Sequence, residues 1–100
     1  MASWAVLTGR RLKSGAYDDW RGAWMPERMD MPAGMTAYIL RKVGDPDEVI
    51  AFGMFEGSLE DLNVMRPDPA AEEARMAGMA PFVESVFADG AYEVVEVVQG

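Results

Sequence analysis

The chain has 100 residues, half of them hydrophobic, and its 9 basic and 17 acidic residues give a formal net charge of −8. This length supports one modest core, so residues 1–100 are expected to form a single domain. The acidic balance repels phosphate backbones and argues against nucleic acid as a partner. The only basic cluster in the sequence is Arg10, Arg11 and Lys13. Three positive charges are too few to indicate a nucleic-acid-binding surface.

The sequence contains neither cysteine nor histidine. Missing thiols exclude disulfides, thiolate nucleophiles and thiolate metal sites. Missing imidazoles exclude histidine-ligated haem, most catalytic zinc sites and triads that need an imidazole base. We therefore expect no metal and no cofactor. No apolar run reaches the roughly 20 residues of a membrane span and the N-terminus lacks a secretory pattern, so we expect a cytoplasmic protein without a membrane partner.

The first part of the chain predicts a strand followed by a helix. Residues 4–12 read as a strand with apolar side chains on both sides. Tyr17, Trp20 and Trp24 then recur at helical spacing. Pro26 would strain the interior of a helix, so this helix is expected to end there or shortly beyond.

The middle of the chain predicts a hairpin and a short helix. Residues 35–43 and 48–56 read as two strands joined by a turn over residues 44–47, whose Gly, Asp and Pro favour turns. Ser58 and Asp61 fit the two ends of a capping box, which predicts that a short helix starts at this point.

The last part predicts helical structure and then a final strand. From Ala70 onwards, apolar residues recur at spacings of three and four; they are Met76, Met79, Phe82, Val83, Val86 and Phe87. Gly78 and Pro81 interrupt this pattern, which predicts a kink or two shorter helices. Gly90 suits a helix C-terminal cap, and residues 91–99 predict the closing strand.

This order of elements indicates an α+β fold. With the short helix treated as an insertion, the order is βαββαβ, the ferredoxin-like arrangement. That arrangement places both main helices on one face of an antiparallel sheet and leaves the other face bare.

The two strands of the hairpin carry apolar side chains on both faces. Ile39 and Ala51 fall on one face, whereas Leu40 and Phe52 fall on the other. Only one face can meet the helices, so the other would expose a larger apolar patch than monomers normally tolerate. A second copy packed sheet against sheet, in a two-fold homodimer, would cover it. The alternative is an unusually apolar edge or a loop that folds over the sheet.

Several segments resemble the dimeric α+β barrel superfamily and, within it, small antibiotic biosynthesis monooxygenase-like proteins. They are Lys13-Ser14-Gly15, Tyr17-Asp18-Asp19-Trp20, the hairpin Arg41-Lys42-Val43-Gly44-Asp45-Pro46-Asp47-Glu48-Val49 and the closing Ala88-Asp89-Gly90-Ala91-Tyr92-Glu93-Val94-Val95. The resemblance lies in element order and turn chemistry more than in a catalytic signature. It implies that two ferredoxin-like protomers form a shared barrel and that each keeps a pocket between its helices and its sheet.

The resemblance also implies a class of function. The superfamily includes cofactor-free oxygenases of aromatic polyketides, haem-degrading enzymes and lactone isomerases. The haem-degrading branch relies on a ligating histidine, which this chain lacks. The implied function is therefore that of a cofactor-independent monooxygenase-like protein acting on a small aromatic or polyketide-like molecule, in which the substrate often supplies the electrons. The alternative is a non-catalytic dimeric module for ligand binding or assembly, because no acid–base constellation stands out.

The candidate ligand-binding residues come mainly from the first helix and the strands. Trp20 and Trp24 share one side of the helix and form either an aromatic pocket wall or part of the core. Arg28 is either an anchor for an anion or an exposed arginine paired with neighbouring carboxylates. The hydroxyl of Tyr38 could donate to an oxyanion if it is buried in the pocket. The full candidate set is Trp20, Trp24, Arg28, Tyr38, Met54 and Phe82.

Overall fold

Four strands and three helices make up the described part of the fold. The computed structural model describes residues 2–25, 34–64 and 68–100. In chain order the elements are β1 (Ser3–Leu12), α1 (Tyr17–Trp24), β2 (Thr36–Lys42), β3 (Asp45–Glu56), α2 (Leu59–Val64), α3 (Pro69–Met79), the 3-10 turn η1 (Ala80–Phe82) and β4 (Val83–Glu93).

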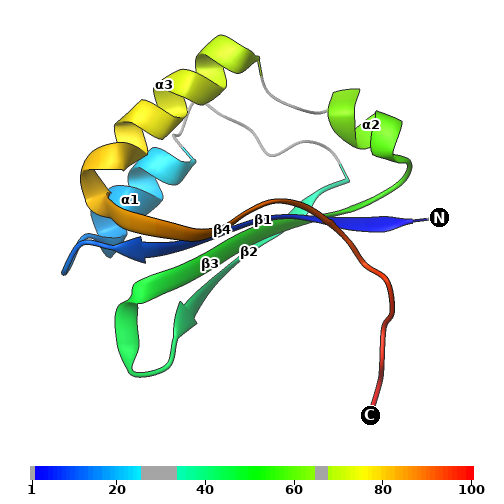
Figure 1. The fold of residues 1–100 in the computed structure, drawn as a ribbon, viewed down its shortest axis with the longest axis horizontal. Coiled ribbons are helices and arrows are strands. Elements are labelled where there is room, and N and C mark those ends of the chain that lie inside the picture. The colour runs from blue at the N-terminus through cyan, green and yellow to red at the C-terminus, as the bar shows by residue number, and fades with distance from the viewer. Residues whose placement is uncertain (1, 26–33, 65–67) are drawn as a thin grey trace.

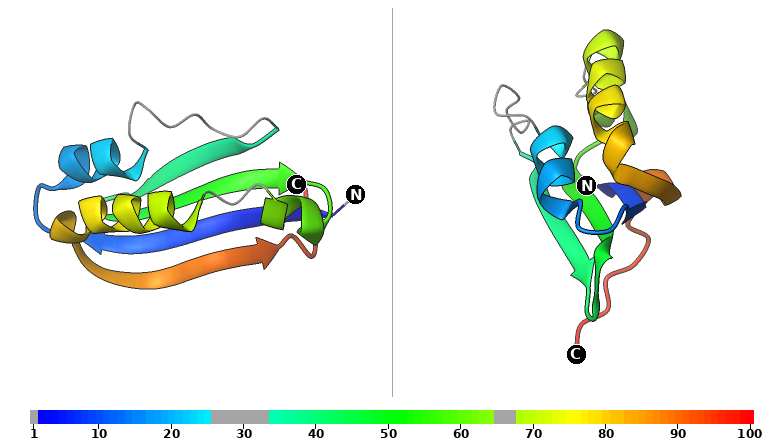
Figure 2. Two further views of the ribbon diagram at one scale, coloured as in Figure 1. Left: turned by 90° about the horizontal axis from the view of Figure 1, so that it is seen from above. Right: turned by 90° about the vertical axis from the view of Figure 1, so that its left-hand side faces the viewer.

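The strands form one antiparallel sheet in the order β2-β3-β1-β4. Both α1 and α3 lie over one face of this sheet, and α2 lies near the end of the sheet where β3 finishes (Figure 1). No described helix covers the opposite face, as the end-on view in Figure 2 shows. The arrangement is the ferredoxin-like α+β fold, which confirms the fold class expected from the sequence.

The two-faced character of the strands is also confirmed. On β3, Val49 and Ala51 are buried beneath the helices, whereas Ile50 and Phe52, which alternate with them, lie on the bare face and are half-buried. Cross-strand pairing carries the same division into β2, because residues directly opposite each other share a face. Leu40 therefore lies beside Ile50 on the bare face.

The closing strand differs from the prediction. The helix α3 ends at Met79, and the chain from Val83 onwards pairs with β1 as strand β4, where residues up to Gly90 were expected to be helical. Pro81 lacks the N–H that a continuing helix needs, so the helix ends before it. Gly90 lies inside the strand with φ 146°, not at a helix cap. The strand ends at Glu93, and residues 94–100 form no strand.

Two local predictions, for the hairpin turn and for the start of α2, can be compared with the structure. The hairpin turns at Val43 and Gly44, where Gly44 has φ 85°, so the turn is shorter than the expected 44–47 and β3 begins at Asp45. At the start of α2 the predicted capping box is confirmed. The N–H of Asp61 donates to the hydroxyl of Ser58 (3.0 Å), and the N–H of Ser58 donates to the carboxylate of Asp61 (3.2 Å).

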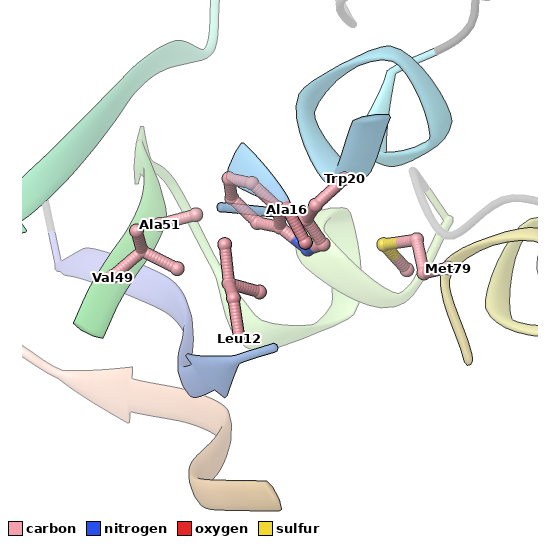
Figure 3. Packing of buried hydrophobic residues seen from close by; sticks show 6 residues of the cluster. All are labelled: Leu12, Ala16, Trp20, Val49, Ala51 and Met79. Atoms are coloured by element: carbon pink, nitrogen blue, oxygen red, sulfur yellow. The ribbon is translucent and has the colours of Figure 1, made fainter. Parts of the chain in front are cut away.

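The core lies between the two main helices and the centre of the sheet. Its six buried members come from β1, the segment before α1, α1 itself, β3 and α3 (Figure 3): Leu12, Ala16, Trp20, Val49, Ala51 and Met79. Trp20 and Leu12 are its largest members with almost no exposure, at 0% and 1%. The helical layer is thus held to the sheet by a small number of large side chains.

The substitution Leu12→Ala is expected to lower the free energy of unfolding by about 2 to 5 kcal/mol, because it leaves a cavity at the centre of the core. Val43→Ala is the matched control, since Val43 is 98% exposed in the hairpin turn, and it should change stability by less than about 0.5 kcal/mol. Urea denaturation followed by circular dichroism measures both. Equal effects of the two substitutions would show that Leu12 is not part of a packed core.

Candidate functional site

A buried arginine lies between the sheet and α3. Arg10 is on the central strand β1, opposite Val49 on the helix-facing side of the sheet, and is 3% exposed. Its Nη1 lies 3.3 Å from the sulfur of Met79, and its Nη2 lies 3.7 Å from the sulfur of Met76. Thioether sulfur is a weak acceptor, so these contacts satisfy a guanidinium poorly.

The charge of Arg10 is only partly compensated. Among the described residues, no carboxylate oxygen lies within the 4.0 Å of a salt bridge from its guanidinium. Burial lowers the pKa of Arg10, and the nearby charge of Arg75 lowers it further, against the raising effects of Asp89 and Glu72. Arginine nevertheless stays protonated at neutral pH. The site therefore holds a buried cation without a direct anionic partner in the described structure.

Arg75 on α3 is engaged elsewhere. Its Nε donates to the backbone carbonyl of Trp24 at the end of α1, and its Nη1 lies 2.9 Å from a carboxylate oxygen of Glu72. Its guanidinium also lies 5.7 Å from the centroid of the Trp24 ring. These contacts join α1 to α3 and place a cation at the negative end of the α1 helix dipole. Arg75 thus fixes the helical layer above Arg10.

A groove of about 250 Å3 runs between α3 and β4 and reaches Arg10. Apart from Arg10, its walls are mainly apolar and are formed by Met76, Met79, Ala80, Val83 and Val86, with Glu84 and Ser85 beside them. A larger hollow of about 430 Å3 lies beside the hairpin turn over residues 41–46. Its lining side chains are mostly exposed, and it contains no buried polar group. The groove at Arg10 is therefore the stronger candidate site.

Trp20 adds a second buried donor without an acceptor. The residue is fully buried, and its indole N–H has no hydrogen-bond partner within the described ranges. Trp20 packs in the same cluster as Met79, and in the view of Figure 3 its nitrogen lies at the end of the ring that faces Met79. Leaving a buried donor unpaired costs about 1 to 3 kcal/mol. The described structure thus contains two buried donor groups, the guanidinium of Arg10 and the indole N–H of Trp20, that lack strong acceptors.

The structure brings together only part of the candidate set predicted from the sequence. Trp20 is a core residue, and Trp24 and Phe82 pack against the same cluster on the helix-facing side. Tyr38 and Met54 lie on the bare face instead, where the Tyr38 ring stacks on Phe52 with centroids 5.2 Å apart. Arg28 lies outside the described residues. The six residues therefore do not line one pocket.

Sequence reasoning missed Arg10 because it grouped this residue with Arg11 and Lys13. The structure separates the two adjacent arginines onto opposite faces of β1. Arg11 forms a salt bridge of 2.8 Å with Asp45 on the bare side. The alternation of side chains along a strand could have identified Arg10 as buried. Residues two apart share a face of the sheet, so Arg10 lies on the same face as the apolar Leu12, which is buried.

Residues 2–25, 34–64 and 68–100 also bear on two other features, a metal site and a membrane span. Over these ranges, no group of three or more acidic side chains converges as a metal site, and none of the helices has the length and apolar character needed to span a membrane. The groove at Arg10 remains the feature of these ranges that points to a ligand.

Comparison with known proteins supports the fold. No protein-family model and no curated protein matches the sequence. The structure matches the crystal structure of a protein from Chloroflexus aurantiacus J-10-fl that is provisionally assigned as an antibiotic biosynthesis monooxygenase, with a TM-score of 0.62 and 18% sequence identity. The match covers 98% of this chain and 96% of that chain. It confirms, at the level of the fold, the resemblance that the sequence indicated.

Replacing Arg10 by methionine is expected to stabilise the protein. Arg10→Met removes a buried charge and fills the space with an apolar chain of similar length, which should raise the free energy of unfolding by about 1 to 4 kcal/mol. Lys13→Met is the control, since Lys13 is exposed, and its effect should stay below about 0.5 kcal/mol. Urea denaturation measures both. A loss of stability in Arg10→Met would show that the guanidinium has a strong partner in solution.

Proposed function

We propose that the protein is a homodimeric, cofactor-independent monooxygenase-like enzyme that acts on a small aromatic molecule bound between α3 and the sheet. The observation that carries this proposal is the buried guanidinium of Arg10 at the base of an apolar groove. Such a site favours a ligand with an apolar body and a negative charge. The shared fold with a provisionally assigned monooxygenase gives further support.

The proposed chemistry draws its electrons from the substrate. An electron-rich phenol loses its proton, and the resulting phenolate donates electrons to O2. One phenol and one O2 then give one quinone and one water, so no external reductant is needed. Arg10 would stabilise the phenolate and lower the pKa of the phenol, because a nearby positive charge favours the ionised form. The apolar walls around Met76 and Met79 would keep water away from the reactive anion.

The bare face of the sheet supports the homodimer. It carries large apolar side chains that remain about half exposed, namely Tyr38 (49%), Leu40 (48%), Tyr92 (47%) and Phe87 (53%), whose ring packs over Gly9 on this face. Half-buried Ile50, Phe52 and Met54 continue the same surface. A patch of this kind is more typical of a protein interface than of free surface. A second copy, related by a two-fold axis, would cover it with the same surface.

The dimer can be tested by substitutions on opposite faces of the molecule. Leu40→Asp places a charge in the proposed interface twice, once from each copy, and should raise the dissociation constant at least about a hundredfold. Val64→Asp is the matched control on α2, where Val64 is 80% exposed, and it should leave the dimer intact. Sedimentation equilibrium at micromolar concentration measures both. A wild-type protein that sediments only as a monomer would contradict the proposed interface.

The oxygenase activity can be tested with dihydroxynaphthalenes in buffer that contains a chelator and no flavin. The expected result is consumption of one O2 for each quinone formed, measured with an oxygen electrode and by absorbance. Arg10→Met should lower the rate about a hundredfold or more, because it removes the charge that stabilises the phenolate. Lys13→Met serves as the control. An unchanged rate in Arg10→Met would place the reaction elsewhere.

The second candidate function is non-catalytic ligand binding by the same dimer. Among the described residues that line the groove, the only carboxylate is that of Glu84, and it lies 3.9 Å from Nε of Arg11. A proton acceptor devoted to the substrate is thus missing from these walls, which favours binding without turnover. Ligand binding with no oxygen consumption across the dihydroxynaphthalenes would favour this second function.

A further inference from the structure

We infer that the groove beside Arg10 binds an aromatic monocarboxylate, held by its charged end at the guanidinium and by its ring along the apolar walls. This inference rests on the proposed function, because it assigns a ligand class to the same groove: the single negative charge of this ligand, its carboxylate, would occupy the position at the guanidinium that the phenolate of an oxygenated substrate would otherwise take, so the two would compete. Four properties of the site support it. They are the weak hydrogen-bond partners of the guanidinium, the partly exposed methionine that covers it, the volume of the groove, and the charges around Arg10.

The guanidinium of Arg10 has donors to offer a ligand. Two of its nitrogens face only the thioether sulfurs of Met79 and Met76 in the described structure. A carboxylate accepts from an arginine through two parallel charge-assisted hydrogen bonds, which are much stronger than bonds to thioether sulfur. The adjacent cation, Arg75, is held by Glu72 and by the backbone carbonyl of Trp24. Arg10 is therefore the anchor, and Arg75 adds only a long-range positive charge.

Met76 is the side chain that controls access to the anchor. It is 39% exposed, whereas Met79 is 1% exposed. Its sulfur also lies farther from the guanidinium, at 3.7 Å from Nη2 compared with 3.3 Å between Met79 and Nη1. An unbranched methionine side chain changes rotamer easily at a partly exposed position. Movement of Met76 would expose Nη2 along the groove without disturbing the core.

The size of the groove limits the body of the ligand. Its volume is about 250 Å3, and an apolar cavity of about 150 Å3 holds benzene. The space therefore suits a body of one or two fused rings. Val83 and Val86 on β4 and Ala80 on η1 line it with methyl groups, which favour a flat apolar surface over a polar one.

The charges around Arg10 limit the ligand to one negative charge. Asp89 and Glu72 act on Arg10 from β4 and α3. Asp89 accepts a hydrogen bond from Thr8 (3.3 Å), and Glu72 is paired with Arg75. A second carboxylate on the ligand would be repelled by the negative charges of these two acidic groups. Repulsion of like charges then disfavours dianions.

The test compares three naphthalene compounds that differ only in charge: naphthoate, neutral naphthalenemethanol and naphthalene dicarboxylate. Equilibrium titration calorimetry in oxygen-free buffer keeps any oxygenation out of the measurement. For the wild-type protein we expect naphthoate to bind at least about tenfold tighter than naphthalenemethanol, as charge-assisted hydrogen bonds predict. The dicarboxylate should bind more weakly than naphthoate.

Two arginine variants on the same strand separate the anchor from general electrostatics. Arg10→Met and Arg10→Gln should both lose the preference for naphthoate over the neutral alcohol. Arg11→Met removes an equal charge from the opposite face of β1 and should retain this preference. Thermal unfolding of each variant establishes that it is folded before it is titrated, and the two Arg10 variants keep the test decisive if one of them does not fold.

Each outcome decides the inference separately from the proposed function. Equal binding of naphthoate and the alcohol by the wild-type protein, no binding of either, or an unchanged preference in both folded Arg10 variants would overturn the carboxylate site. Oxygen consumption with dihydroxynaphthalenes in the absence of any naphthoate preference would overturn it while the proposed function stands. A preference that depends on Arg10, together with no oxygen consumption, would support the carboxylate site and refute the oxygenase.

Discussion

The constraint on which this structure depends is a sheet that is apolar on both faces and covered by helices on only one. Along β3, Val49 and Ala51 are buried beneath α1 and α3, while Ile50 and Phe52, which alternate with them, face the other way. The two faces therefore differ in what covers them within the described structure. The helix-facing side of the sheet contains the groove and its buried cation, and the bare face remains for the proposed partner copy. The proposed ligand binding and the proposed assembly would then change independently, because they would use opposite sides of one sheet.

The space between the helical layer and the sheet is not a fully packed core. The buried side chains of Trp20 and Met79 fill part of it. Val6, on the helix-facing side of β1, is still 40% exposed. In this space Arg10, on β1, occupies a position that an apolar residue would fill with less electrostatic cost. Binding sites often carry such locally unfavourable groups, since a site optimised for a ligand is not optimised for stability alone. The contacts of Arg75 hold α1 and α3 in place around it.

The sequence predicted most of the fold and little of the site, for physical reasons. Strand parity over residues 36–56 and the capping box at Ser58 depend on local patterns, which the structure retains. Strand β4 was mistaken for helix because Val83 and Val86 fit a spacing of three, and only pairing with β1, a non-local contact, decides between the two. Arg10 was overlooked because charged side chains are rarely buried. Tyr38 was placed in the pocket because parity divides a strand into two faces without showing which one meets the helices.

The two thioethers over Arg10 also make the site sensitive to oxidation. Peroxide converts a methionine thioether to a sulfoxide, which is polar and carries an oxygen that accepts hydrogen bonds well. Met76 is the accessible one of the pair, so it would react first. Its new oxygen would lie within reach of the guanidinium, where the anion of a ligand is proposed to bind. Oxidation of Met76 would thus place a sulfoxide oxygen at the guanidinium in the position proposed for the ligand. The site would stay blocked until a sulfoxide reductase restored the thioether.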